Sequence, residues 1–277
     1  VMTGIPISKV SKSERNKILN LDNALKNIIV GQDRAIDSVS NAIKLSRSGL
    51  KNPNRPVGVF LFLGPTGVGK TESVKSLAKC LFSDDNALIR IDMSEFAERF
   101  SMSRLIGSPP GYVGYNEGGE LTEKVRRNPY SVVLFDEIEK GHPDIYNILL
   151  QVFDEGILTD SLGRKIDFKN TILIMTSNIG TKNLDNLSYG FYENSDKKDY
   201  VKMEKNILKS VESIFSPELL NRIDETIVFN SLKKTDVYEI IDLQLIDLIK
   251  NLSELGIKIK VYKSAKSLVL EKGYNVE

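Results

Sequence analysis

A chain of 277 residues is long enough for one large domain and a smaller one. Its hydrophobic content of 41% and charged content of 27% are ordinary for a soluble globular protein, and its net charge of +1 gives no electrostatic argument for binding to nucleic acid or to an anionic membrane. No apolar run approaches the roughly 20 residues that span a bilayer, and a single cysteine excludes an internal disulfide.

The first part of the chain predicts helices, and its centre predicts a parallel sheet. Val1–Pro6 has neither a signal-peptide pattern nor the look of a natural start, so we expect a segment of a longer chain. Ile18–Ser48 has helical periodicity broken at Val30–Asp33, and Asn52–Pro56 predicts a loop. Five continuous, β-branched-rich runs then predict strands covered on both faces: Val57–Leu63, Ala87–Ile91, Val132–Phe135, Thr171–Met175 and Thr226–Phe229. Helix-compatible stretches separate most of these runs, which favours an α/β fold with helices on both sides of a parallel sheet.

Two segments depart from this alternation. Ile157–Thr159 and Lys165–Phe168 predict a small hairpin on one face of the sheet. Asn183–Lys205 is polar, dotted with aromatic residues and irregular, which indicates a mobile loop.

The pattern changes after the last predicted strand. Apolar residues recur every three or four positions between Val237 and Leu252, which predicts a long helix that Gly256 ends. Ile257–Val261 alternates like a half-buried strand, and Ser264 begins another helix. We therefore expect a large α/β domain over residues 1–230 and a smaller, incomplete α+β domain over residues 231–277.

The most specific motif lies between the first predicted strand and the helix that follows it. It reads Gly64-Pro65-Thr66-Gly67-Val68-Gly69-Lys70-Thr71. A strand, a glycine-rich loop, Lys-Thr and a helix form the architecture that wraps backbone N–H groups around a nucleotide's phosphates. Lys70 can reach the β- and γ-phosphates, and the Thr71 hydroxyl can complete a Mg²⁺ shell. The alternative is a turn that contains glycines by chance, and the complete pattern with its flanks disfavours it.

Polar residues follow two of the predicted strands. Asp136 and Glu137 follow an apolar strand, and acids at the carboxyl end of a parallel strand project into the ligand crevice. With a phosphate loop upstream, Asp136 is placed to hold Mg²⁺ and Glu137 to polarise the attacking water. Asn178 ends the next strand at the same edge, where it can contact the γ-phosphate or the water. The alternative for Asn178 is an Asx turn, and spacing alone does not decide between the two.

Two further sites are ambiguous as isolated residues. Arg222 precedes the last strand, where it can pair with Asp224 or reach a neighbouring subunit's γ-phosphate, and the residues alone favour the first. Tyr112 and Val113 lie in a loop with prolines and glycines. Such a loop can cover a turn or form a flexible surface that grips an apolar polymer.

Taken together, these residues resemble the second ATPase domain of the Clp chaperones, which are AAA+ protein unfoldases. The likeness covers nearly the whole chain, with Gly64–Thr71 similar to Walker A and Val132–Glu137 to Walker B. It implies that Asn178 is sensor 1, that Arg222 is the arginine finger and that Tyr112 and Val113 belong to the pore loop. It also implies that Ile29 and Val30 pack on adenine.

The resemblance implies partners as well. It predicts a homo-hexamer in which ATP lies between subunits, with unfolded or tagged proteins as substrates and neither nucleic acid nor membrane as partner. Tyr189-Gly190-Phe191 resembles the tripeptide with which ClpC-type unfoldases dock onto the ClpP protease, although the first position is usually aliphatic. We favour a ClpC-like unfoldase over a ClpB-like disaggregase. The candidate locations are the cytosol and a plastid-type stroma.

The chain departs from the family pattern in one respect, and two other functions are possible for it. The family's sensor 2 arginine follows the point where this chain stops, at Glu277, so the fragment is expected to hydrolyse ATP weakly. A nucleic-acid motor on the same nucleotide core is disfavoured by the near-zero net charge. The third hypothesis is a module that binds nucleotide without hydrolysing it.

Overall fold

The computed structural model describes residues 12–82, 84–108, 111, 118–180 and 197–273. Its centre is a five-stranded parallel sheet in the order β2-β3-β6-β1-β7. The strands are β1 (Gly58–Leu63), β2 (Leu88–Asp92), β3 (Val132–Asp136), β6 (Ile172–Ser177) and β7 (Glu225–Val228). They confirm the five predicted strands, with boundaries that shift by one or two residues.

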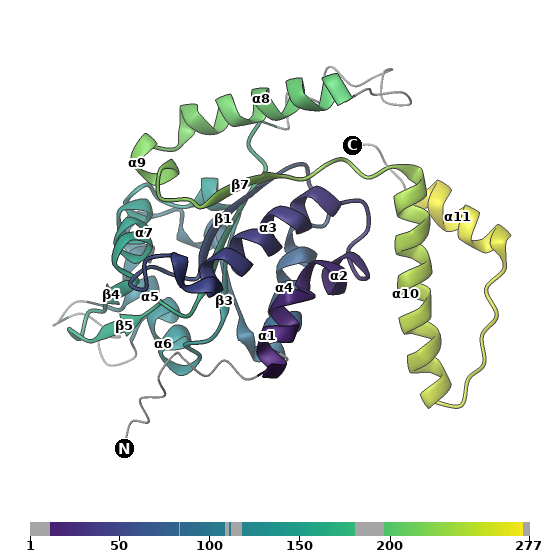
Figure 1. The fold of residues 1–277 in the computed structure, drawn as a ribbon, viewed down its shortest axis with the longest axis horizontal. Helices are drawn as coiled ribbons and strands as arrows, with labels where there is room; N and C mark the ends of the chain where they lie inside the picture. Colours follow the sequence, from purple (N-terminus) through teal and green to yellow (C-terminus); the bar gives the residue numbers. More distant parts are fainter. Residues whose placement is uncertain (1–11, 83, 109–110, 112–117, 181–196, 274–277) are drawn as a thin grey trace.

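Helices cover both faces of this sheet (Figure 1). One face carries α2 (Leu21–Lys26), α3 (Asp33–Leu45) and α4 (Lys70–Phe82), and the other carries α6 (Glu120–Arg127), α7 (Asp144–Glu155) and α8 (Lys197–Ile214). Side chains of β1 alternate between the two layers: Phe60 and Phe62 belong to one apolar cluster, whereas Val59, Leu61 and Leu63 belong to the other. Because every residue of β1 is buried, the strand has the continuous apolar sequence of a doubly covered sheet.

The shorter elements connect these layers. They are α1 (Lys12–Leu19), α5 (Met102–Ile106), α9 (Pro217–Leu220) and the antiparallel pair β4 (Ile157–Thr159) and β5 (Lys165–Asp167). The pair confirms the predicted hairpin. The predicted interruption at Val30–Asp33 is also present, because α2 ends at Lys26 and α3 begins at Asp33.

The prediction of an irregular segment up to Lys205 was wrong for its last part, because α8 begins at Lys197. Ile207 and Val211 on α8 are buried against the sheet, and this anchors the helix. Lysine and glutamate are good helix formers, so a polar stretch next to such an anchor can continue the helix. Polarity alone therefore did not distinguish a polar helical turn from a loop.

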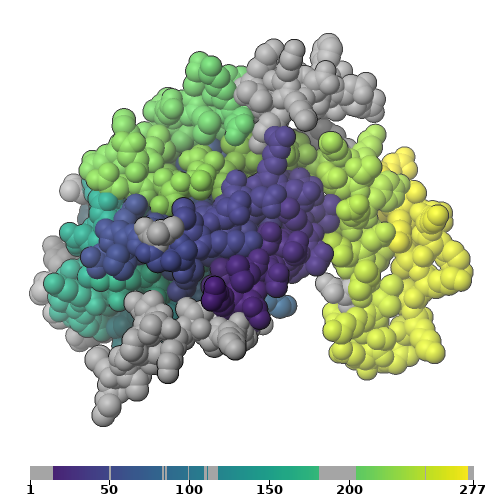
Figure 2. Space-filling model, viewed as in Figure 1, coloured from purple at the N-terminus to yellow at the C-terminus, as the bar shows by residue number. Residues whose placement is uncertain are grey.

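The C-terminal part consists of α10 (Lys234–Glu254) and α11 (Lys263–Gly273), which lie beside the large unit (Figures 1 and 2). Gly256 follows α10 with a φ of 76°, as expected for a residue that ends a helix. The predicted strand over Ile257–Val261 was wrong: no strand of the described residues pairs with it, and Ile257 and Ile259 are exposed. An alternating pattern forms a strand only where a partner supplies hydrogen bonds. Among the described residues, no helix is long and apolar enough to cross a membrane.

Candidate functional site

The glycine-rich loop leaves the carboxyl end of β1 and leads directly into α4. Gly67 and Gly69 have φ values of 81° and 98°, which side chains with a Cβ rarely adopt. A Cβ at either position would meet nothing within 4 Å, so backbone conformation rather than crowding requires glycine there. Successive N–H groups in such a loop, followed by a helix N-terminus, form a site for an anion.

Lys70, the first residue of α4, is the central cation of the site. Its side chain is buried, and its Nζ donates to the carbonyl oxygens of Gly64 at 2.5 Å and Pro65 at 2.7 Å and to Asn178 Oδ1 at 2.6 Å. Burial lowers the pKa of Lys70 to about 8, against the opposing effect of the nearby carboxylates of Glu139, Asp136 and Glu137. A bound phosphate would add further negative charge and raise that pKa, which would keep the ammonium protonated. Thr71 is half-buried in the same turn.

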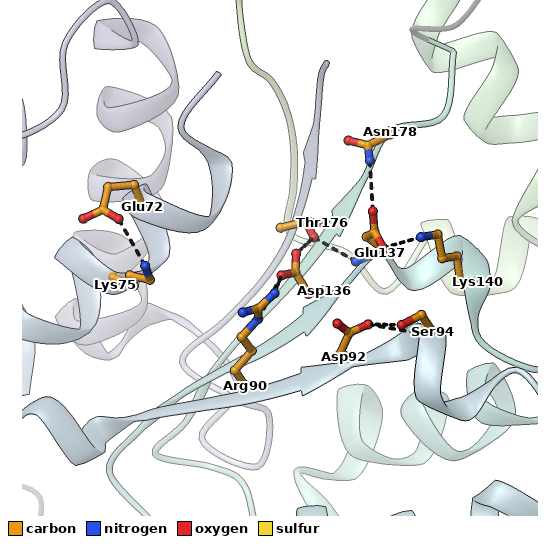
Figure 3. A network of polar contacts seen from close by, with 10 residues as sticks. All are labelled: Glu72, Lys75, Arg90, Asp92, Ser94, Asp136, Glu137, Lys140, Thr176 and Asn178. Atoms are coloured by element: carbon orange, nitrogen blue, oxygen red, sulfur yellow. Dashed lines mark hydrogen bonds and ion pairs between the residues drawn. The ribbon is translucent and has the colours of Figure 1, made fainter. Parts of the chain in front are cut away.

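Asp136 ends β3 and is nearly buried (Figure 3). Its Oδ1 accepts a hydrogen bond from Thr176 Oγ1 at 2.5 Å, and its Oδ2 contacts the Arg90 guanidinium at 2.7 Å. Thr71 and Asp136 supply hard oxygen ligands, which suit Mg²⁺ when the nucleotide's phosphates complete the shell. The described residues contain no cluster of three or more His, Cys, Asp or Glu side chains that could hold a metal by themselves.

Glu137 has a left-handed backbone, with φ 55° and ψ 53°. It is the one residue other than glycine with a positive φ in the described part of the chain, and such strain is concentrated at functional sites. Its N–H donates to Thr176 Oγ1 at 3.0 Å, which holds the turn. Its carboxylate accepts from Lys140 Nζ at 2.6 Å and from Asn178 Nδ2 at 3.4 Å, and this carboxylate raises the pKa of Lys140.

Asn178 connects the phosphate loop to the acidic strand end. Its Oδ1 accepts from Lys70, its Nδ2 reaches Glu137, and its backbone N–H donates to Glu139 Oε1 at 3.0 Å. The structure therefore brings Lys70, Glu137 and Asn178 into one contacting group, as predicted from their positions at the carboxyl ends of β1, β3 and β6. The role of each residue in catalysis remains a proposal.

The segment expected to contact adenine lies beside the loop. Ile29 is buried in the same apolar cluster as Val68, and Val30 is half-buried. The nearby cavity has a volume of only about 10 Å³, and its walls include Leu25, Ile29 and Phe229. Ile29 is thus packed into the core, and Val30 is the more accessible of the pair.

Arg222 lies at the opposite edge of the sheet from Lys70. The N–H of Asp224, two residues later, donates to Val59 O near the start of β1, whereas the loop follows the end of β1. Six residues of a strand span about 20 Å, so Arg222 cannot reach the phosphates of its own chain.

The predicted pairing of Arg222 with Asp224 was wrong. Arg222 forms an ion pair with Asp154 of α7, which raises the pKa of Arg222, whereas Asp224 accepts from Lys51 Nζ at 2.5 Å and Val59 N at 2.8 Å. Because Asp224 closes the start of β1, its carboxylate is directed at the sheet rather than at Arg222.

Tyr112, Val113 and Tyr189-Gly190-Phe191 lie outside the described residues. The two ends of the tyrosine loop are described and lie together: a Cβ on Gly119 would come within 2.4 Å of Leu105 O. The N–H of Ser161, in the turn between β4 and β5, donates to Ile106 O at 3.2 Å. The hairpin therefore packs against the base of this loop.

Sequence reasoning missed three side chains that touch the acidic pair: Arg90, Lys140 and Thr176. The register supplied a signal for Thr176, because Phe135 pairs with Met175 and the next residues, Asp136 and Thr176, therefore lie side by side. Nothing local indicated Arg90, whose guanidinium reaches Asp136 from β2.

Comparisons with known proteins show which families the chain matches. Residues 55–226 match the family described as AAA domain (Cdc48 subfamily), and residues 232–277 match the C-terminal, D2-small domain of ClpB protein. The chain is 52% identical over 99% of its length to the ATP-dependent Clp protease ATP-binding subunit ClpC of Staphylococcus aureus (strain USA300), and 50% identical to that of Staphylococcus saprophyticus. It covers 34% of each relative, so it spans about a third of their length.

Replacing Thr176 by valine tests the hydroxyl that connects the two acids. The Thr176→Val variant keeps the shape of the side chain but leaves the Glu137 N–H without a partner. It also removes the hydrogen bond to Asp136 Oδ1, so that the buried carboxylate keeps only its contact with Arg90. We expect the free energy of unfolding to fall by about 1–3 kcal/mol, measured by urea denaturation. Thr176→Ser, which retains the hydroxyl, is the control; an equal loss in both variants would contradict this role.

Proposed function

Because the chain belongs to the AAA family of ATPase domains, we propose that it hydrolyses ATP as part of a ring-forming protein unfoldase of the Clp type. The observation that carries the proposal is the contacting group of Lys70, Asn178 and Glu137 at one edge of the sheet. In this group the amide of Asn178 is hydrogen-bonded both to a phosphate-binding cation, Lys70, and to a candidate general base, Glu137. We further propose residues 1–230 as the nucleotide-binding domain and residues 231–277 as part of a small C-terminal domain.

We assign the chemistry as follows. The backbone of Pro65–Gly69 cradles the phosphates of ATP, with Lys70 on the β- and γ-phosphates. Thr71 and Asp136 hold Mg²⁺, which neutralises charge on the phosphate oxygens. Glu137 accepts a proton from the attacking water, and Asn178 orients that water or the γ-phosphate. The pair with Lys140 and the hydrogen bond from Asn178 fix the position of the Glu137 carboxylate beside the phosphate loop.

The position of Arg222 supports a ring. Its distance from the chain's own loop leaves the γ-phosphate of a neighbouring subunit as its target, which is a heterologous interface of the kind that closes into a ring. We propose a homo-hexamer in which Arg222 completes the next subunit's site, with the pair to Asp154 holding the guanidinium at the interface. Val30 and Ile29 flank the adenine.

A mixing experiment tests this assignment. In the full-length protein, Arg222→Ala and Glu137→Gln should each lower ATP turnover by about 10³-fold while ATP still binds. Mixed one to one, the two inactive proteins should recover about a quarter of the wild-type turnover, because that fraction of interfaces combines an intact Glu137 with an intact neighbouring Arg222. If Arg222 acted within its own chain, mixing would restore nothing.

Coupling to polypeptide is tested at Tyr112. We propose that this residue grips a translocating chain, as the resemblance implies. Tyr112→Ala should keep ATP turnover within about twofold of wild type but abolish unfolding of a tagged fluorescent protein. The control is Tyr130→Ala, since Tyr130 is 58% exposed on another segment. Full unfolding activity in Tyr112→Ala would refute the gripping role.

We also propose that a ClpP-type protease receives the unfolded chain, because the similar proteins carry the name of a Clp protease subunit. The second candidate is a ClpB-type disaggregase without a protease, favoured by the match of residues 232–277 to a ClpB domain. Both candidates act on unfolded proteins, and the bacterial relatives favour the cytosol over a plastid-type stroma.

Capture of the protease separates the two candidates. Immobilised ClpP-type protease should retain the full-length wild type. The Phe191→Ala variant should bind at least about tenfold less, because aromatic anchors dominate such contacts. Phe100→Ala removes an 88% exposed phenylalanine elsewhere and should bind normally. Absence of wild-type capture would favour the disaggregase.

A further inference from the structure

Gln32 is a buried polar side chain that the proposed chemistry does not use. It is 1% exposed, and its amide joins two segments that are far apart in the sequence. Nε2 donates to Val68 O in the phosphate loop at 3.2 Å and to Asn230 O at 2.9 Å, and Oε1 accepts from Asn230 N at 3.0 Å. Gln32 therefore connects the phosphate loop to the chain that leaves β7.

The base of the phosphate loop touches the same chain. A Cβ on Gly64 would lie 3.0 Å from Phe229 O, and the Phe229 N–H donates to Leu63 O at 2.7 Å. The rings of Phe62 and Phe229 are 5.0 Å apart. The segment Phe229–Asn230 thus contacts the loop directly at its base and through Gln32 at Val68.

The residue before Gln32 reaches the start of α10. Gly31 has a φ of 77°, and a Cβ there would lie 2.9 Å from Asp236 Oδ2 and 3.3 Å from Leu232. Asp236 in turn accepts the Lys233 N–H at 2.9 Å, which fixes the first turn of α10. Figure 2 shows α10 beside the purple N-terminal helices. The contacts of Gly31 with Asp236 and of Gln32 with Asn230 place residues 31–32 where the chain passes into α10.

Peptide geometry connects the anion site to this joint. In a trans peptide the N–H and the preceding C=O point in opposite directions. When the Gly69 N–H is directed at a phosphate, the Val68 carbonyl is therefore held on the opposite side, where Gln32 Nε2 binds it. A change in the orientation of this peptide changes the position of the Gln32 amide and, through it, that of Asn230.

We propose that Gln32 is a positioning residue that couples phosphate binding in the loop to the orientation of the small C-terminal unit. This inference rests on the proposed function, because it requires that ATP binds at Lys70. In this role Gln32 transmits the direction of the Val68 carbonyl to the link before α10. Its loss should uncouple domain movement from nucleotide binding, rather than abolish binding.

Gln32→Glu is the sharpest variant, because it keeps the shape of the side chain and removes the donor. The test measures the distance between two spin labels, one on Lys209→Cys of α8 and one on Lys272→Cys of α11. It uses the full-length protein in a Cys80→Ala background, with and without the slowly hydrolysed analogue ATPγS. Both labelled positions are exposed. Gln244→Glu makes the same chemical change on an exposed face of α10 and serves as the matched control.

We expect ATPγS to shift the distance in wild type and in Gln244→Glu. In Gln32→Glu, less than about half of that shift should remain. Its affinity for a fluorescent ATP analogue should stay within about fivefold of wild type, while kcat for ATP falls about tenfold. Gln32→Met, of similar length and without a charge, is measured in parallel. Gln32→Met should show the same reduced distance shift, and it keeps the test valid if the buried carboxylate of Gln32→Glu unfolds that variant.

Three results would overturn the proposal: a full distance shift in both Gln32 variants, no shift in wild type, or a loss of ATP affinity of about a hundredfold that accounts for the loss of movement. A hundredfold loss of ATP affinity would mean that Gln32 only supports the loop.

Failure of the proposed unfoldase function gives a different result. The wild type would then bind ATP and show the distance shift but fail to unfold tagged protein.

Discussion

Parallel register between β1, β3 and β6 is the constraint on which the site depends. Leu63 pairs with Ser177 across β1 and β6, and Phe135 pairs with Met175 across β3 and β6, so the three strands end at one level. Polar residues that follow them are then forced together, although about forty residues or more separate Lys70, Glu137 and Asn178 in the chain. A slip of one residue would turn every side chain to the other face, and the two apolar layers prevent it.

Burial makes this group of charges interdependent. Lys70 lies where desolvation disfavours an ammonium, and three carboxylates within electrostatic range offset only part of that penalty, so the pKa of Lys70 stays lowered. The same carboxylates are in turn held by cations on the rim, Arg90 on Asp136 and Lys140 on Glu137. The site is thus a set of alternating charges whose members constrain each other, and an incoming triphosphate with its Mg²⁺ has to be accommodated within that balance.

The sequence predicted those features whose chemistry is local. The phosphate loop, the five strands, the hairpin and the acidic strand end each have a complete signature within about ten residues. Features that depend on distant partners were not predictable: Arg90 and Thr176 acquire their partners through strand pairing, and the partner of Arg222 is on α7. The start of α8 and the absence of a strand at Ile257–Val261 were missed for the same reason, since packing decides both.

The two edges of the sheet carry different groups, and this polarity is what the proposed ring requires. The carboxyl edge carries the phosphate loop with Glu137, and the amino edge carries Arg222, held by Asp154 and by the hydrogen bond of 2.8 Å from Arg55 NH2 to Arg222 O. In the proposed ring, a subunit with these groups on opposite edges completes its neighbour's site rather than its own. β7 leads from the Arg222 edge to Asn230 at the phosphate edge. In the proposed ring, a shift at Gln32 therefore acts on the strand that begins beside Arg222, and this strand connects one subunit's nucleotide to the interface that serves the next.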